Sequence, residues 1–157
     1  MISERSKDSP NVISCPPMLF LGALGLGLFL NWLVPSPEFS SVSFKVTGGL
    51  LAFIGSMVCG WGILTFQLAG TNVRPNRPVT ALVTGGPFRY SRNPLYVGMT
   101  VIYLGIALYA GALWPLATLV PALAVVRWRI VIREEEYLEA RFGENYRAYK
   151  ARVNRWI

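Results

Sequence analysis

The stretch "PLYVGMTVIYLGIALYAGALWPLATLVPALAVV", residues 94–126, contains no charged side chain. As one α-helix it would be about 50 Å long at 1.5 Å per residue, which exceeds the roughly 30 Å hydrocarbon core of a membrane. The stretch must therefore fold back on itself, and we expect the turn at "AGALWP", residues 110–115. This reasoning predicts two apolar helices, at 94–111 and 113–132.

Two further apolar stretches precede this one, at 17–34 and 46–68. The second contains five glycines and Ser56, which give small surfaces for close contact between membrane helices. The whole chain has 157 residues, of which 53% are hydrophobic and only 15% are charged. A soluble domain of this length is less apolar. The sequence therefore predicts a single all-α integral membrane domain, residues 1–157, with about four transmembrane helices.

The positive charges cluster around these spans. Apart from Lys45, every lysine and arginine falls in the N-terminal tail, in the loop 69–93 or in the segment from Arg127 onward. With four crossings all three regions lie on one side, which the positive-inside rule identifies as cytoplasmic. We therefore expect a multi-pass protein with both termini, a long loop and C-terminal helices in the cytoplasm.

Composition also excludes some functions. The net charge of +7 is typical of contact with anionic lipid headgroups when the basic residues flank apolar spans, so we expect no nucleic-acid partner. The chain has no histidine and only two widely separated cysteines. We therefore expect no metal site, and any chemistry must proceed without an imidazole.

Polar side chains gather at the start of the third apolar stretch, in residues 84–98, "TGGPFRYSRNPLYVG". Pro94 suits the first position of a helix, whose free amides favour an anion. Arg92 can hold a carboxylate or phosphate through a fork of two hydrogen bonds, Asn93 can donate and accept, and Tyr96 offers a ring and a hydroxyl. These residues predict a polar ligand site, although a helix cap beside an interfacial aromatic belt has the same composition.

A second polar segment, residues 129–156, follows the fourth apolar stretch and contains three consecutive glutamates at 134–136. In a helix, Glu134 lies on one face with Leu138, and Glu135 lies beside Leu138. Neighbouring carboxylates repel one another, so we expect a positive group near them, either Arg129, Arg133 or a cationic ligand.

The end of this segment predicts a short final helix. Gly143 should end the preceding helix, and Tyr146 and Tyr149 should then share a face of a helix that carries Arg152 and Arg155. An amphipathic surface helix bound to acidic lipids has the same pattern.

Together these segments resemble the membrane methyltransferases grouped around isoprenylcysteine carboxyl methyltransferase, with phospholipid N-methyltransferases as more distant relatives. The resemblance covers about the C-terminal half of the chain. The R-H-P-x-Y element of this family corresponds to residues 92–96, with Asn93 in place of the histidine. Its E-E-x-x-L element falls on 134–138, and its F-G-x-x-Y-x-x-Y run with V-P-R falls on 142–155, with Asn154 in place of the proline.

The resemblance implies an enzyme that binds S-adenosylmethionine in a pocket capped by cytoplasmic segments, while a lipophilic acceptor enters from the bilayer. It implies catalytic roles for Arg92, Asn93 and Glu135. The residues that it implies for cofactor binding are Tyr90, Arg92, Asn93, Pro94, Tyr96, Glu134, Glu135, Leu138, Tyr146 and Tyr149.

The acceptor stays open between an isoprenylcysteine-type carboxylate, a thiol and an aminolipid. Two other functions also fit an apolar chain of this kind. One is a membrane reductase of the sterol-reductase type, which would bind a nicotinamide cofactor. The other is a non-enzymatic membrane protein that uses its basic surface to bind acidic lipid or a partner.

Overall fold

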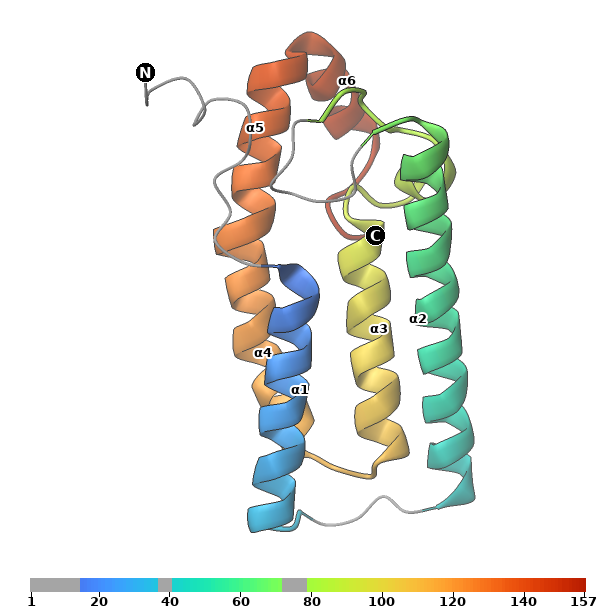
Figure 1. Cartoon of the computed structure of the whole chain (residues 1–157), viewed down its shortest axis with the longest axis vertical. Helices are drawn as coiled ribbons and strands as arrows, with labels where there is room; N and C mark the ends of the chain where they lie inside the picture. The colour runs from blue at the N-terminus through green and yellow to red at the C-terminus, as the bar shows by residue number, and fades with distance from the viewer. Residues whose placement is uncertain (1–14, 37–40, 72–78) are drawn as a thin grey trace.

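A computed structural model describes residues 15–36, 41–71 and 79–157, and this part of the chain is helical without strands (Figure 1). The helices are α1 (Pro16–Leu33), α2 (Val42–Leu68), the 3-10 turn η1 (Gly86–Arg89), α3 (Pro94–Tyr109), α4 (Trp114–Val125), the π-helical segment η2 (Val126–Val131), α5 (Ile132–Phe142) and α6 (Glu144–Arg152).

The four apolar helices lie where the sequence predicts them. In the described part of the chain, three helices are long and apolar enough to cross a membrane: α1, α2 and the continuous helix Trp114–Phe142, which comprises α4, η2 and α5. The remaining apolar helix, α3, has 16 residues. The number of crossings and the side on which the termini lie therefore remain predictions. Part of the positive charge on which the predicted orientation depends falls in residues 1–14 and 72–78, which lie outside the described residues.

Glycine fixes both sharp turns that the sequence predicts. The return between α3 and α4 contains Gly111 at φ +64°, and α5 ends at Gly143 with φ +54°. Residues with a Cβ atom rarely adopt this left-handed backbone conformation, whereas glycine does so without steric cost. Both predictions are confirmed.

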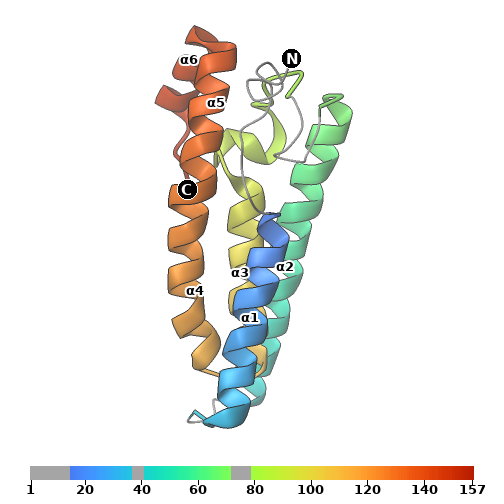
Figure 2. The same ribbon diagram turned by 60° about the vertical axis from the view of Figure 1, so that its left-hand side comes forward.

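Helices α1 to α4 run up and down alongside one another (Figures 1 and 2). Helix α2 packs along α3, and α1 packs along α4. Glycines permit the close approach of α2 and α3: a Cβ atom built on Gly105 would lie only 2.5 Å from the backbone nitrogen of Ala52 and 2.6 Å from the carbonyl oxygen of Gly48. Such contacts replace hydrophobic burial as a source of stability where lipid surrounds the helices.

One end of the bundle carries the polar segments. The end of α2, the turn η1, the start of α3 and the helices α5 and α6 gather there (Figures 1 and 2). The apolar core lies deeper, around Phe20, Tyr103, Leu119 and Ile130. The two segments that the sequence predicts for a ligand site therefore meet, although the glutamates lie 40 to 42 positions beyond Pro94, the start of α3.

Candidate active site

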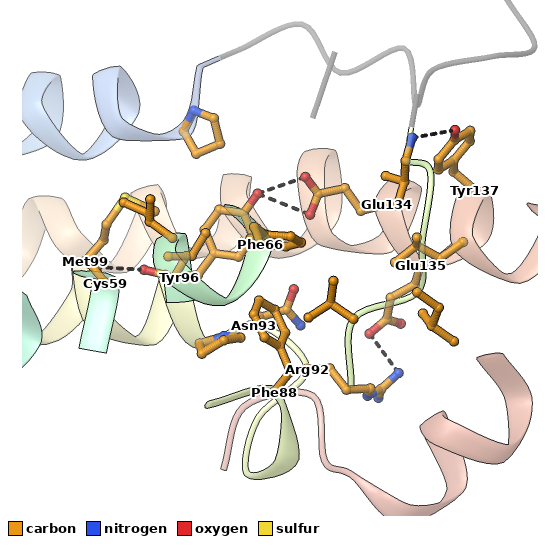
Figure 3. A pocket seen from close by; sticks show the side chains of 18 of the residues that line it. Cys59, Phe66, Phe88, Arg92, Asn93, Tyr96, Met99, Glu134, Glu135 and Tyr137 are labelled. Atoms are coloured by element: carbon orange, nitrogen blue, oxygen red, sulfur yellow. Dashed lines mark hydrogen bonds and ion pairs between the residues drawn. The ribbon is translucent and has the colours of Figure 1, made fainter. Parts of the chain in front are cut away.

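A cavity of about 590 Å³ lies at this end of the bundle (Figure 3). Its size is that of a site for a small organic ligand. The residues predicted from the sequence that line it are Arg92, Asn93, Pro94, Tyr96, Glu134, Glu135, Leu138, Tyr146 and Tyr149. Tyr90 is not brought into it: its side chain is 70% exposed and lies against Trp61, with 6.4 Å between ring centroids. The short turn η1 directs this ring outward.

The rest of the lining is mostly apolar and comes from elements in which no polar pattern marks a site. Helix α2 contributes Cys59, Ile63 and Phe66, and the segment that precedes η1 contributes residues 81–83. The beginning of α1 adds residues 15–17. Nothing in their spacing distinguishes these residues from ordinary membrane-helix residues, so sequence reasoning missed them.

Arg92 lies between η1 and α3, and its side chain is only 9% exposed. Its Nη1 atom is 3.1 Å from Oε1 of Glu135, which is an ion pair by distance. Neither Nη1 nor Nε, however, has a hydrogen-bond partner among the residues that the structure describes. Buried charged donors without partners are costly, and nearly all such groups in folded proteins find an acceptor. Arg92 therefore brings unused hydrogen-bonding capacity to the wall of the cavity.

Glu135 on α5 is the acceptor for a second arginine. Arg155 donates to it from Nε at 2.9 Å and from Nη2 at 2.8 Å, one bond to each carboxylate oxygen. Glu135 is 6% exposed. A buried carboxylate is stabilised by such a fork, because two charge-assisted hydrogen bonds replace its lost hydration.

Glu134 has different surroundings. The hydroxyl of Tyr96 donates to its two carboxylate oxygens at 3.0 and 3.1 Å (Figure 3). Among the described residues it forms no ion pair with lysine or arginine. The adjacent glutamates thus differ: Glu135 is paired with two arginines, whereas Glu134 lines the cavity and receives its hydrogen bonds from the described residues through the neutral hydroxyl of Tyr96.

Asn93 is buried and uses its amide for the backbone. Its Nδ2 atom donates to the carbonyl oxygen of Arg155 at 3.0 Å, and its main-chain N–H donates to Oγ of Ser91 at 3.1 Å. The main-chain N–H of Arg92 donates to the carbonyl oxygen of Asn154 at 3.0 Å. The start of α3 is therefore bound to the last residues of the chain.

Tyr146 and Tyr149 lie on one face of α6, as predicted, and both are buried, with 6.2 Å between ring centroids. The hydroxyl of Tyr149 donates to the carbonyl oxygen of Phe88 at 2.7 Å. Burial is the main cause that raises the pKa of both phenols, so they stay neutral near pH 7. These rings close the cavity on the side of α6.

The sequence leaves the positive group near the glutamates open between Arg129, Arg133 and a cationic ligand. The structure pairs Glu135 with two other cations, Arg92 and Arg155. The position of Arg155 needs correction: the sequence predicts it on the final helix, whereas α6 ends at Arg152 and Val153 is already extended. The chain leaves the helix because the carbonyls of Asn154 and Arg155 are held by the segment 91–93.

Comparison with known proteins places this arrangement in a family. Residues 44–145 match the phospholipid methyltransferase family, which is about two thirds of the chain. The chain belongs to that family. Within the grouping that the sequence resembles, the match selects the phospholipid branch. The matched range contains nearly all of α2, Arg92 and both glutamates. It ends just before Tyr146, so it does not extend to Tyr149 or Arg155.

Two fungal proteins are similar to this chain, and each is described as a phosphatidyl-N-methylethanolamine N-methyltransferase. The protein from Saccharomyces cerevisiae is 43% identical over 63 residues, which is 40% of this chain and 30% of that protein. The protein from Emericella nidulans is 30% identical over 118 residues, 74% of this chain and 57% of that protein. The chain therefore spans less than two thirds of either relative.

A third relative of this chain is an uncharacterized protein from Haemophilus influenzae. It is 38% identical over 64 residues, which is 40% of this chain and the whole of that protein. No solved structure matches the chain.

Proposed function

We propose that this chain is an S-adenosylmethionine-dependent membrane N-methyltransferase whose acceptor is the amine of an ethanolamine-type phospholipid. One observation carries the proposal. A single cavity has a largely apolar wall and two polar side chains that lack a matching partner among the described residues: Arg92, with buried donors that make no hydrogen bond, and Glu134, a carboxylate that forms no ion pair. A polar cofactor and a lipid headgroup require these features together.

The residues present fit the methyl donor. The free donors of Arg92 match a carboxylate in charge and in the planar geometry of the fork. Phe88, Tyr146 and Tyr149 offer aromatic and apolar surface for a nucleoside. When bound, S-adenosylmethionine supplies a methyl group on a positively charged sulfur. The fungal relatives are named as methyltransferases, which is consistent with this cofactor.

Glu134 is suited to the acceptor. An alkyl ammonium is protonated near pH 7 and has no lone pair for a new bond. We assign the headgroup ammonium to Glu134, which takes its proton. The freed nitrogen lone pair then forms the bond to the methyl carbon as the bond between that carbon and sulfur breaks, with the electron pair left on sulfur. Tyr96 fixes both oxygens of Glu134 and so orients the carboxylate.

The apolar lining is suited to the lipid. Ile63 on α2 and Met99 and Ile102 on α3 extend the cavity away from the glutamates. We assign this part to the glycerol and acyl region of the phospholipid, where it excludes water from the reacting nitrogen.

Asn93 and Glu135 then have supporting roles. Each is buried and is bonded to the last residues of the chain. We propose that they position Arg92 and the start of α3, and that the proton-handling carboxylate is Glu134. In place of a family histidine, Asn93 supplies a hydrogen-bond donor for the carbonyl of Arg155.

The proposal is tested with the full chain in detergent or in lipid nanodiscs. Isothermal titration should give micromolar binding of S-adenosylhomocysteine and none of a nicotinamide dinucleotide, which would identify the reductase alternative. Labelled methyl groups should then pass from S-adenosylmethionine to phosphatidyl-N-methylethanolamine vesicles but not to phosphatidylcholine, whose nitrogen has no proton to lose.

Folded protein that binds neither cofactor would contradict an enzymatic role and favour a lipid- or partner-binding protein. Binding of S-adenosylhomocysteine with transfer to a prenylated thiol or carboxylate, and none to aminolipid, would overturn the acceptor assignment alone.

A further inference from the structure

Two arginines share the carboxylate of Glu135, and they share it unequally. Arg155 donates to each oxygen, at 2.9 Å from Nε and 2.8 Å from Nη2. Arg92 approaches Oε1 at 3.1 Å, and within the described part of the chain it makes no hydrogen bond from Nη1 or Nε. The better geometry belongs to Arg155, although Arg92 is the more deeply buried of the two, at 9% against 28% side-chain exposure.

A forked pair occupies a carboxylate in a particular way. Its two N–H groups lie parallel and meet the two oxygens in one plane, so a second guanidinium cannot form the same fork with that carboxylate. With Arg155 in this position, Glu135 supplies Arg92 with an opposite charge but not with hydrogen bonds. The positive charge of Arg92 is thus tolerated in a buried place while its Nε and Nη1 donors stay available.

The backbone holds Arg155 where its side chain reaches Glu135. Its carbonyl oxygen accepts from Nδ2 of Asn93 at 3.0 Å and from Oγ of Ser91 at 3.4 Å. The neighbouring carbonyl, of Asn154, accepts from the main-chain N–H of Arg92 at 3.0 Å. The end of the chain is therefore in register with the segment 91–93 through three hydrogen bonds. Arg155 is not among the residues that line the cavity.

We propose that Arg155 is a positioning residue that keeps Arg92 free to bind the carboxylate of the methyl donor by occupying both oxygens of Glu135. This inference rests on the proposed function. Among the described residues, Arg92 is the only other cation paired with Glu135. Without Arg155 it would turn to form the fork itself, and its donors would be lost to the ligand. Loss of Arg155 should then weaken only the binding of the carboxylate of the ligand, and not the binding of its nucleoside.

The experiment compares two ligands of the purified full chain by isothermal titration. S-adenosylhomocysteine carries the carboxylate, and 5′-methylthioadenosine has the same nucleoside and thioether without it. In Arg155→Gln we expect the affinity for S-adenosylhomocysteine to fall about tenfold, the loss of roughly one charge-assisted interaction. The affinity for 5′-methylthioadenosine should change less than about twofold. Arg152→Gln is the matched control, because Arg152 is exposed at the end of α6.

A double variant separates positioning from a merely structural role. Arg155→Gln combined with Glu135→Gln removes the carboxylate that would capture Arg92, so most of the affinity for S-adenosylhomocysteine should return. Arg155→Lys retains the charge without the fork. It should lose less affinity for S-adenosylhomocysteine than Arg155→Gln does, and its affinity for 5′-methylthioadenosine should not change. This variant also provides a folded protein for the test if Arg155→Gln is unstable.

Equal losses for the two ligands, or no recovery in the double variant, would overturn the inference and leave the proposed function standing. Wild-type protein that binds neither ligand would overturn the proposed function and the inference with it.

Discussion

Tyr96 on α3 donates its hydroxyl to both carboxylate oxygens of Glu134, at 3.0 and 3.1 Å, across 38 positions of sequence. The next residue along the helix, Glu135, is bound instead by Arg92 and Arg155. A single pair of neighbouring glutamates thus has one member that receives a neutral hydrogen bond and one that is neutralised by cations. This difference divides the site into a part suited to a cation and a part suited to an anion, and the predictions below test each part.

Glu134→Gln should abolish most of the methyl transfer while leaving cofactor binding intact. The amide keeps the size of the side chain but can neither hold an ammonium by charge nor take its proton. We expect the turnover of phosphatidyl-N-methylethanolamine to fall about 100-fold or more, as is typical when a general base is lost. The affinity for S-adenosylhomocysteine, measured by titration, should stay within about twofold.

Glu136→Gln is the control for that change, because Glu136 is exposed and follows on the same helix. It should leave both measurements unchanged. If Glu134→Gln instead weakened S-adenosylhomocysteine binding as much as it slowed transfer, Glu134 would belong to the cofactor and not to the acceptor.

Arg92→Lys should weaken S-adenosylhomocysteine binding by about five- to tenfold, because lysine keeps the charge but cannot form the planar fork. The corresponding change at Arg89, an exposed residue of η1, should have no effect. Unchanged affinity in Arg92→Lys would remove Arg92 from the ligand site.

Much of the fold follows from the sequence for simple physical reasons. The uncharged run at 94–126 is too long for one crossing, so a return had to exist, and glycine at 111 and 143 marks the turns. Helix lengths follow in the same way, since apolar residues must fill a layer of fixed thickness. The length of the helix that starts at Trp114 is an exception, since it exceeds what one crossing needs. It continues through η2 and α5 to Phe142, because no glycine or proline follows η2 before Gly143.

The partners within the site do not follow from local pattern. Arg155 lies beyond the final helix and reaches Glu135 only because the segment 91–93 binds the carbonyls of the tail. Such a pairing depends on the tertiary contact of distant segments, for which neither spacing nor composition gives a signal. Tyr90 illustrates the converse: it is close to Arg92 in sequence, yet η1 turns it to the surface.

Tyr149→Phe should lower stability and reduce its dependence on alkaline pH. The change leaves the buried carbonyl of Phe88 without its donor, which should cost about 1–3 kcal/mol. Burial raises the pKa of the Tyr149 phenol above that of the unfolded chain, about 10. The unfolded state therefore releases its proton first, and the stability from the neutral phenol is complete below about pH 10 and lost as the pH rises further.

Thermal unfolding in detergent from about pH 8 to about pH 11 measures both effects. The midpoint of the wild-type protein should fall over the upper part of this range, and that of Tyr149→Phe should start lower and fall less. Parallel curves would show that Tyr149 does not contribute to the pH dependence.

Gly105→Ala should destabilise the bundle, whereas Gly49→Ala should not. Both glycines lie inside apolar helices, so alanine brings a similar gain in helix propensity at each, about 0.5–1 kcal/mol. Their surroundings differ: a Cβ atom on Gly105 would lie 2.5 Å from the nitrogen of Ala52, whereas none of the described atoms lies within 4 Å of one on Gly49. Because the obstacle is backbone, α3 must move away from α2 to admit the methyl group.

The unfolding midpoint in detergent should therefore fall for Gly105→Ala and stay equal or rise for Gly49→Ala, and the difference between them measures crowding alone. The affinity for S-adenosylhomocysteine provides a second measurement. Gly105 is eleven residues from Pro94, roughly 16 Å along the helix axis, so a separation of α3 from α2 at that depth should reach Arg92 only weakly. If both variants had the same midpoint, close packing of α2 on α3 would not be what holds this half of the bundle together.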